Sequence, residues 1–278
     1  MLKEIEELRK RCNRKIYGAY LLWILITVVF WIYEFGFGNR TLYRGSMTFM
    51  IGGLGLPIVL LSGNKQASVY VDEFRNAFLN HLFDKRINLS FIEYGKGIDR
   101  YDMAEWGVIE EATRYYTRDL IEGNCLGTDF RMSFVNASKE HEIFAQNLYR
   151  PLEVQIFSGC YLMTKLKTPV KGKVFVSCDS LQVLTSQEKT FKSMFKVRCE
   201  GCTASEILSD DLKDKMMKIT LEHSGAMFGV VDGWLHVAIP RYTSLAAPSL
   251  DSKVDPALIE RMEKQMKEIN ELILLLCE

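Results

Sequence analysis

The sequence has no excess of charge of either sign, because 35 Lys and Arg residues balance 35 Asp and Glu residues. Proteins that bind nucleic acid through its phosphates usually carry a basic excess, so we predict no nucleic-acid partner. Histidine is also scarce: its four residues lie far apart, and none belongs to an H-E-x-x-H motif. Neither nucleic-acid binding nor metalloprotease chemistry is therefore indicated.

Two further catalytic patterns are incomplete. Ser158 lacks the flanking glycines of the G-x-S-x-G nucleophile elbow. The glycine-rich stretch from Gly52 to Gly55 lacks the lysine that a phosphate-binding loop requires. The sequence thus favours a protein without catalytic activity, although it leaves the enzyme question open.

Cysteine usage indicates a reducing compartment. The chain has an odd number of cysteines without the dense, regular spacing of a secreted disulfide scaffold. They are the seven residues at positions 12, 125, 160, 178, 199, 202 and 277.

Long apolar runs occur only near the start of the chain. Residues 16–37 read IYGAYLLWILITVVFWIYEFGF, and residues 46–62 read SMTFMIGGLGLPIVLLS. About 20 helical residues span the hydrocarbon layer of a bilayer, and the first run contains a single charge, Glu34. We predict a transmembrane helical hairpin at 16–62, with the lipid bilayer as one partner and the rest of the chain outside the lipid.

The second apolar run contains small residues that let helices in lipid approach closely. These predicted membrane-packing residues are Gly52, Gly53 and Gly55, and Pro57 is expected to kink the helix. A glycine- and proline-interrupted helix also suits a transport pathway. Two spans without an intramembrane charge make a poor conduit, however, so an anchor is favoured.

The distribution of basic residues predicts the orientation. Six Lys and Arg residues precede the first apolar run, and two lie between the runs. Because basic residues that flank a span stay in the cytoplasm, we expect two spans with both termini in the cytoplasm.

The rest of the chain reads as an α+β protein. Residues 1–15 have helical spacing and should extend the first span as a cytoplasmic tail, whereas 63–123 read as a helical connector, with helices at 67–85 and around 102–113. Residues 124–254 read as a mainly antiparallel sheet domain with flanking helices. Strands are expected at 129–135, 152–165, 173–178, 195–199, 217–222, 227–231 and 234–239, with a helix at 203–215 and a type I′ turn at Asp232-Gly233.

The last segment, 255–278, is predicted to be an amphipathic helix with Asp255 as its cap. Its apolar residues recur at alternating spacings of three and four, which is a heptad seam. The seam comprises Ile259, Met262, Met266, Ile269, Ile273 and Leu276. It either docks on the chain's own sheet or amino-terminal helix, or mediates self-association or binding to a partner protein.

Cys199 and Cys202 form the most suggestive chemical motif. Two thiolates three residues apart can bind zinc, but a structural site needs two further ligands, for which only His223 and His236 are near in the predicted strands. A redox role would place the pair at a helix start with a lowered pKa. The zinc and redox interpretations are alternatives to two ordinary small side chains at a strand end.

Several stretches, in this order along residues 16–240, resemble an uncharacterised bacterial family of two-span membrane proteins whose shared region is known only as a domain of unknown function. After the apolar hairpin these are residues 119–123, 128–134, 156–161, 172–176, 191–197, 204–208 and 229–239, and the sequence departs from the family pattern at Ser158 and Cys160. The resemblance implies an inner-membrane protein with a cytoplasmic domain, and it supplies no catalytic residues.

Three functions follow as hypotheses. The leading one is a membrane-anchored cytoplasmic interaction or sensing module without catalytic activity. The alternatives are a membrane-associated enzyme or metal or redox protein that uses Cys199 and Cys202, and a small-ligand sensor with a deep pocket lined by aromatic residues of the sheet.

Overall fold

The computed structural model describes residues 2–36, 46–145, 148–167, 170–178, 190–243 and 247–278. The chain divides into two compact units. The helical unit comprises Met1–Leu82 and Ala246–Glu263, and the sheet unit comprises Phe83–Leu245 and Lys264–Glu278. The predicted α+β class is confirmed, with an apolar amino-terminal helix and an antiparallel sheet.

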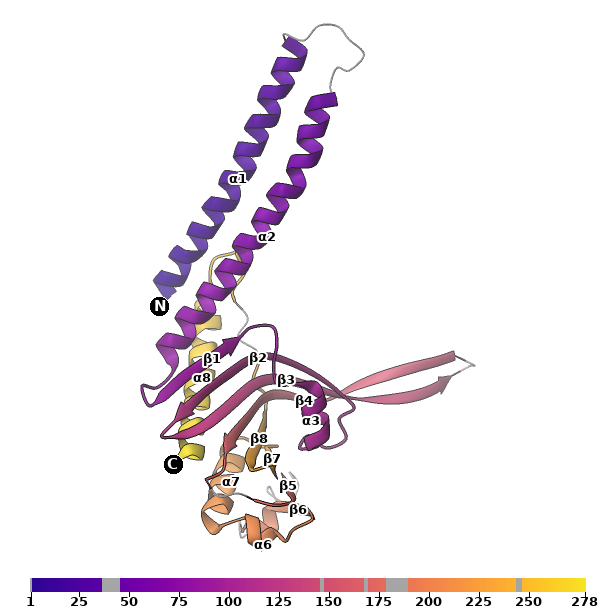
Figure 1. The fold of residues 1–278 in the computed structure, drawn as a ribbon, viewed down its shortest axis with the longest axis vertical. Helices are drawn as coiled ribbons and strands as arrows, with labels where there is room; N and C mark the ends of the chain where they lie inside the picture. Colours follow the sequence, from indigo (N-terminus) through magenta and orange to yellow (C-terminus); the bar gives the residue numbers. More distant parts are fainter. Residues whose placement is uncertain (1, 37–45, 146–147, 168–169, 179–189, 244–246) are drawn as a thin grey trace. The chain divides into compact units, whose positions relative to one another are not determined.

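Two long helices that lie side by side form most of the helical unit (Figure 1). Helix α1 spans Leu2–Gly36 and α2 spans Ser46–Leu82. The predicted tail at 1–15 is thus continuous with the first apolar run, as expected. Helix α2 likewise joins the second apolar run and the amphipathic segment that follows into one helix, which passes through Pro57.

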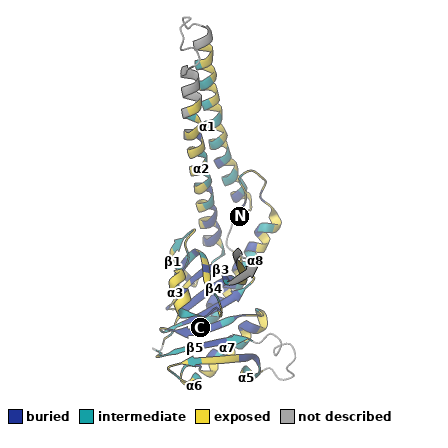
Figure 2. Ribbon diagram, turned by 90° about the vertical axis from the view of Figure 1, so that its right-hand side faces the viewer, coloured by how far each residue is buried: buried dark blue, intermediate teal, exposed yellow. Residues whose placement is uncertain are grey.

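The apolar residues of α1 are largely unburied (Figure 2). Leu21, Leu25 and Tyr33 are each more than 60% exposed. Of the residues described, those of α1 form the one helix that is long and apolar enough to cross a membrane, and none of its most apolar window is buried. An apolar surface of this extent is unfavourable in water. Exposed apolar patches of this kind mark contacts with lipid or with another protein.

Of the two predicted packing glycines Gly53 and Gly55, Gly55 lies closer to α1. A Cβ atom there would lie 2.5 Å from Cδ1 of Trp23, whereas a Cβ atom at Gly53 would meet nothing within 4 Å. The side-chain environment of Gly52 lies outside the described residues. Gly55 therefore permits the close approach of the two helices, and its role in packing within lipid stays a prediction.

The segment before the last helix is bound to the start of α1. The Leu250 carbonyl accepts hydrogen bonds from Nη1 of Arg9 at 2.9 Å and Nδ2 of Asn13 at 2.7 Å. Arg9 also forms an ion pair with Glu6 at 2.7 Å. The hydrogen bond from Arg9 lowers the pKa of the Glu6 carboxyl to about 2. These contacts fix residues 250–254 to the charged end of α1.

The sheet unit contains one eight-stranded sheet in the order β1-β2-β3-β4-β8-β7-β5-β6, and every pairing between these strands is antiparallel (Figure 1). The strands are β1 Ile87–Glu93, β2 Arg114–Cys125, β3 Thr128–Ala145, β4 Leu148–Lys165, β5 Lys173–Cys178, β6 Phe195–Glu200, β7 Met227–Val231 and β8 Trp234–Pro240. The helices are α3 Arg100–Trp106, α5 Phe191–Met194, α6 Ala204–Ile207, α7 Asp210–Glu222 and α8 Pro256–Cys277.

Both faces of the sheet are buried. Tyr161 and Met163 of β4 belong to a core cluster with α3 and the segment after it, including Met103 and Val108. Because side chains alternate along a strand, Leu162 and Thr164 point to the opposite face. There Thr164 lines the same cleft as Leu212 of α7 and Leu276 of α8, so these helices cover that face.

Two positions explain how β8 fits between β7 and β4. Asp232 and Gly233 have φ angles of 53° and 76°, which confirms the predicted turn between β7 and β8. Gly159 of β4 faces Pro240, and a Cβ atom at Gly159 would collide with the Ile239 carbonyl group. The absence of a side chain at Gly159 therefore permits the close strand contact.

β3 and β4 extend beyond their neighbours as a two-stranded arm (Figure 1). Pairing with β2 ends at Ser138, and pairing with β8 begins at Gly159, so the strands between these points pair only with each other. Both strands are longer than predicted. Antiparallel pairing between them continues to Ala145 and Leu148, where the sequence shows little hydrophobic alternation.

Three sequence predictions are wrong. Residues 63–123 are helical only in part, in α2 up to Leu82 and in α3, because β1 and β2 also lie within them and the sheet begins at Ile87 rather than after residue 124. Residues 217–222 belong to helix α7, not to a strand. The expected helix at 203–215 is two helices, because Ser209 caps α7 by accepting a hydrogen bond from the Leu212 N–H at 3.2 Å.

Candidate binding clefts

Cys199 and Cys202 lie at and just beyond the end of edge strand β6, and both are partly buried. The Cys202 thiol donates to the Lys173 carbonyl at 3.4 Å. Burial raises the pKa of the Cys199 thiol, which disfavours the thiolate that a redox nucleophile requires. The following helix, α6, has four residues and gives little dipole to counter this effect.

The additional zinc ligands considered for this pair have other contacts. Nδ1 of His236 lies 3.0 Å from the Tyr161 hydroxyl, and Nδ1 of His223 lies 3.3 Å from the Tyr242 hydroxyl. Across the described parts of the chain, no three His, Cys, Asp or Glu side chains are grouped to hold a metal ion. Zinc binding by Cys199 and Cys202 stays a prediction.

The heptad seam of α8 is mostly covered by the chain itself. Ile259, Met262, Met266, Ile269 and Ile273 are buried, whereas Leu276 is partly exposed. Asp255 caps the helix as predicted, accepting the Ala257 N–H at 3.0 Å. This burial supports docking within the chain over an open seam for a second copy.

The aromatic residues of the sheet fill the core. Tyr161 is 1% exposed, and Trp106 stacks over it with ring centroids 6.5 Å apart. His236 is fully buried beside both rings, and burial lowers its pKa to about 4. The Tyr161 hydroxyl and both ring nitrogens of His236 have partners inside the core, with Nε2 lying 3.3 Å from the Val231 carbonyl oxygen, so these side chains order the core rather than line an aromatic pocket.

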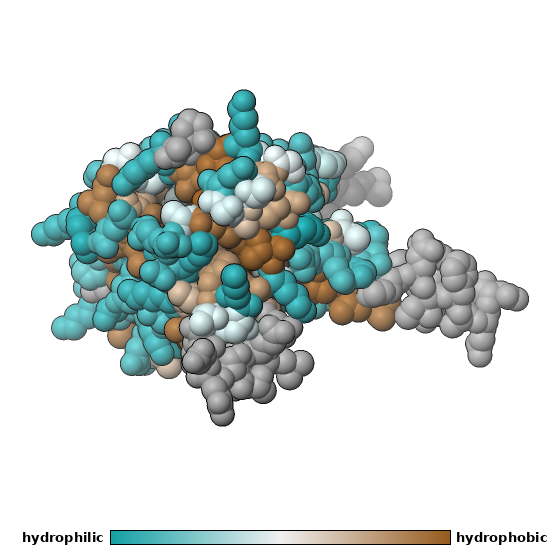
Figure 3. Space-filling model, turned by 90° about the horizontal axis from the view of Figure 1, so that it is seen from below, coloured by the Kyte–Doolittle hydropathy of each residue, from teal (hydrophilic) through white to brown (hydrophobic). Residues whose placement is uncertain are grey.

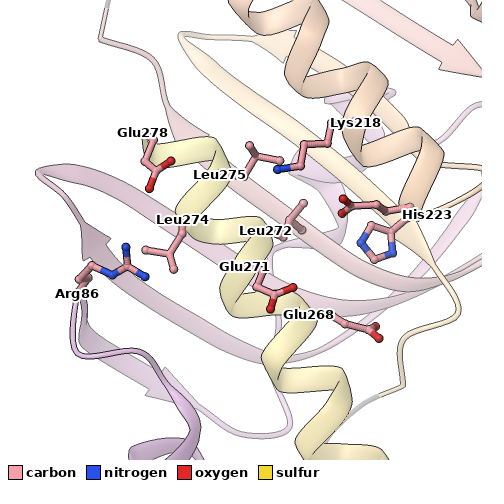
Figure 4. A pocket seen from close by; sticks show the side chains of 10 residues that line it. Arg86, Lys218, His223, Glu268, Glu271, Leu272, Leu274, Leu275 and Glu278 are labelled. Atoms are coloured by element: carbon pink, nitrogen blue, oxygen red, sulfur yellow. The ribbon is translucent and has the colours of Figure 1, made fainter. Parts of the chain in front are cut away.

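A first cleft, which we name the α7–α8 cleft, lies between these two helices and has a volume of about 590 Å³ (Figure 4). Lys218, Glu222 and His223 line it from α7 and the residue after it, and Arg86 lines it from the segment before β1. The α8 side contributes Glu268, Glu271, Leu272, Leu274, Leu275 and Glu278. Its lining is therefore strongly charged, with acidic groups in excess.

Tyr242 contacts two residues that line the α7–α8 cleft. The Tyr242 hydroxyl donates to Oε2 of Glu268 at 3.0 Å and lies 3.3 Å from Nδ1 of His223. Burial, and next its bond to Glu268, raise the pKa of Tyr242. The phenol therefore stays protonated. Its bond to Glu268 holds the segment that follows β8 against α8, which is a structural role.

A second cleft of about 670 Å³ is lined by residues of β3, β4 and β8 and of helices α7 and α8. We name it the lysine cleft because Lys165, Lys167, Lys171 and Lys215 line it. Its apolar lining includes Leu166, Val170, Ile207, Leu212, Leu235 and Leu276. This volume is within the range of small-molecule sites, which are mostly apolar with a few placed polar groups.

The floor of the lysine cleft contains an unusual polar group. Thr128 is 7% exposed and lines the cleft, and its Oγ1 has no hydrogen-bond partner among the residues that the structure describes. A buried hydroxyl without a partner costs about 1–3 kcal/mol. Cys277 also lines the cleft, but burial raises the pKa of its thiol to about 12, so it is no nucleophile at neutral pH.

Apolar groups also reach the outer surface in patches between hydrophilic residues, as the view from below shows (Figure 3).

Sequence reasoning found neither cleft. The lysines at 165, 167 and 171 are close in sequence and could have been noticed, but Thr128, Leu212 and Leu276 are brought to them only by the fold.

No family model matches the chain, and no curated protein matches it. Among solved structures, the crystal structure of the mycobacterial trehalose monomycolate transport factor A, TtfA, is similar with a TM-score of 0.28 and 12% identity. The match covers 71% of this chain and 90% of that chain. A likeness with so low a TM-score and identity establishes neither the fold nor the function of this chain. The resemblance to the two-span family stays a prediction.

Proposed function

We propose that the protein is a membrane-anchored binding module without catalytic activity, in which α1 and the first half of α2 cross the bilayer and the sheet unit interacts with a partner or ligand in the cytoplasm. The observation that carries this proposal is the unburied apolar surface of α1. Lipid is the environment in which such a surface is stable.

The register of the two helices supports two spans. Asn13 and Ile16 of α1 line the same hollow as Leu60 and Asn64 of α2. Both helices therefore change from polar to apolar residues at the same level. Helix α2 has 37 residues, or about 55 Å at 1.5 Å per residue, so it is long enough to cross about 30 Å of hydrocarbon and continue beyond it.

The charges at this level support a cytoplasmic position for both helix ends. Arg9, Arg14 and Lys15 lie at the polar end of α1, and Lys65 follows Asn64 in α2. Basic residues that flank a span stay on the cytoplasmic side. Both termini are then cytoplasmic, and the membrane is the inner membrane if the bacterial resemblance holds.

A binding role is favoured over catalysis by the clefts' chemistry. Both clefts are lined by aliphatic and charged side chains, and the histidine of the α7–α8 cleft is held by Tyr242. Fixed charges and apolar surface suit recognition. The enzyme alternative depends on Cys199 and Cys202.

Purified full-length protein in mild detergent tests this choice. We expect no stoichiometric zinc, and we expect identical metal content for wild type and Cys199→Ser. A stoichiometric zinc that Cys199→Ser loses, or turnover of a substrate that single substitutions in one cleft abolish, would instead establish the enzyme or metal alternative.

A further inference from the structure

We propose that the lysine cleft binds a single-chain amphiphile with one anionic head group, of the fatty-acid class. This inference rests on the proposed binding role of the sheet unit. It requires a head-group site, an apolar channel beside it, and a polar group in the cleft that awaits a ligand.

The head-group site lies beside Thr128. Thr128 begins β3 two residues before Phe130, which pairs with Thr164 at the end of β4. The β4 chain then continues through Lys165 and Lys167 along the cleft. An anion here would accept a hydrogen bond from the Thr128 hydroxyl and face the ammonium groups of Lys167 and Lys171, which follow β4, and such charge-assisted bonds are the stronger kind.

The charges favour an anion. Lys165, Lys167 and Lys171 have no ion pair with any residue that the structure describes, whereas Lys215 pairs with Asp211 at 3.2 Å. Glu206, which also lines the cleft, accepts the Thr203 N–H at 3.0 Å. Glu206 keeps its negative charge, and Glu278 is the other acidic lining residue without a lysine partner, so three unpaired cations face two anions.

The apolar part of the ligand has its own surface. Leu235 of β8 pairs with Thr164 of β4, so both side chains point to the same face of the sheet. Leu235 therefore extends the floor of the cleft away from Thr128 and Thr164. Leu212 of α7 and Leu276 of α8 form the walls. An acyl chain would remove these aliphatic groups from water, at roughly 25 cal/mol per Å² of surface buried.

The chain offers a matched pair of variants. Thr128 and Thr220 are both buried threonines whose Oγ1 lacks a partner among the described residues, but only Thr128 lines the lysine cleft. Threonine and valine have the same shape, so both Thr→Val changes remove an unsatisfied hydroxyl without leaving a cavity. Neither should lower stability, and only Thr128→Val should weaken ligand binding.

The test uses full-length protein in phosphatidylcholine nanodiscs with a photoreactive 16-carbon fatty acid, and the labelled residues are mapped by mass spectrometry. We expect labelling at residues that line the lysine cleft, competed by palmitate but at least about tenfold less well by hexadecanol, which has the same chain without the charge. Thr128→Val should reduce labelling about tenfold, and so should the triple change of Lys165, Lys167 and Lys171 to Gln.

Controls and contrary results are defined by the same variants. Thr220→Val, and Lys218→Gln in the α7–α8 cleft, should label like wild type. The proposal is overturned if hexadecanol competes as well as palmitate, if Thr128→Val equals Thr220→Val, or if the cleft is not labelled. Insertion into the nanodiscs is scored separately, so loss of labelling in inserted protein overturns the ligand assignment and leaves the anchoring proposal standing.

Discussion

The indole of Trp23 in α1 lies directly against the backbone of Gly55 in α2, where a Cβ atom would be 2.5 Å from Cδ1. The two helices can therefore meet at this level only because position 55 has no side chain. This contact belongs to the apolar part of both helices, and in the proposed two-span anchor it lies in lipid, where packing rather than the hydrophobic effect holds helices together.

Replacement of Gly55 should loosen the helical pair. Gly55→Ala places a methyl group against Trp23 and should destabilise the pair by about 1–3 kcal/mol, the usual range for overpacking. Gly53→Ala is the matched control, since a Cβ atom there meets nothing within 4 Å. Unfolding of full-length protein in bicelles, followed by tryptophan fluorescence, measures the difference. Equal stability of the two variants would contradict the contact.

Loss of Arg9 should release the segment around Leu250. Arg9→Ala removes the donor to the Leu250 carbonyl and the ion pair with Glu6, so limited proteolysis should cut residues 250–254 faster. Arg11 is exposed and serves as the control. If Arg9→Ala and Arg11→Ala are cut at the same rate, these bonds do not fix the segment.

The same contact predicts a pH dependence. The pKa of Glu6 is about 2 in the folded chain, below its ordinary value of 4.5, because Arg9 hydrogen-bonds to it. A carboxyl with a lowered pKa contributes stability above pH 4.5 that is lost as the pH falls toward 2. Residues 250–254 should thus stay protected from a pepsin-type protease at pH 4 and lose protection near pH 2. Early loss, at pH 4, would contradict the lowered pKa.

Two glycines of the sheet should respond differently to alanine. A Cβ atom at Gly159 meets the Ile239 backbone, whereas one at Gly229 meets the side chain of Val108 at 2.7 Å. A side chain can yield by rotation, but a paired backbone cannot, so Gly159→Ala should lower the free energy of unfolding more than Gly229→Ala. Urea denaturation of the full chain measures both, and the reverse order would contradict the β4–β8 register.

His236 should make the stability of the sheet unit depend on pH. Its pKa is about 4 when folded and 6.5 when exposed, so the unfolded chain binds a proton that the folded chain rejects between these values. The free energy of unfolding should fall as the pH is lowered from 6.5 to 4, by up to about 1.4 kcal/mol per pH unit from this group. His236→Gln should lose this component, and the exposed His81→Gln should retain it. Identical pH profiles for both variants would contradict a buried neutral imidazole.

The sequence predicted those elements whose pattern is local. The apolar run of α1, the cap at Asp255 and the turn at Asp232-Gly233 each depend on residues within a few positions, and all three are confirmed. The helix at 217–222 was missed because Met217 and Leu221 resemble strand residues until α7's buried face is seen as a whole. Strands β1 and β2 were missed because polar residues interrupt both of them and Gly95 and Gly97 follow shortly after β1.

The clefts were beyond sequence reasoning for a different reason. Thr128, Leu235 and Leu276 come from three elements far apart along the chain, and only the sheet register and the position of α8 bring them together. Burial of Thr128 without a partner is likewise visible only after folding. The heptad seam of α8 was identified, but its coverage by the chain depends on the same tertiary contacts.

Membrane insertion with both termini in the cytoplasm is the claim on which the proposed function depends. The most direct measurement fuses a compartment-sensitive reporter after Glu278 and places an epitope between Gly36 and Ser46, in cells whose membranes are also extracted with alkaline carbonate. We predict that the protein stays in the membrane fraction, that the reporter is active in the cytoplasm, and that the epitope is accessible from outside the membrane. Recovery in the aqueous fraction, or a reporter at Glu278 on the far side of the membrane, would contradict the proposal.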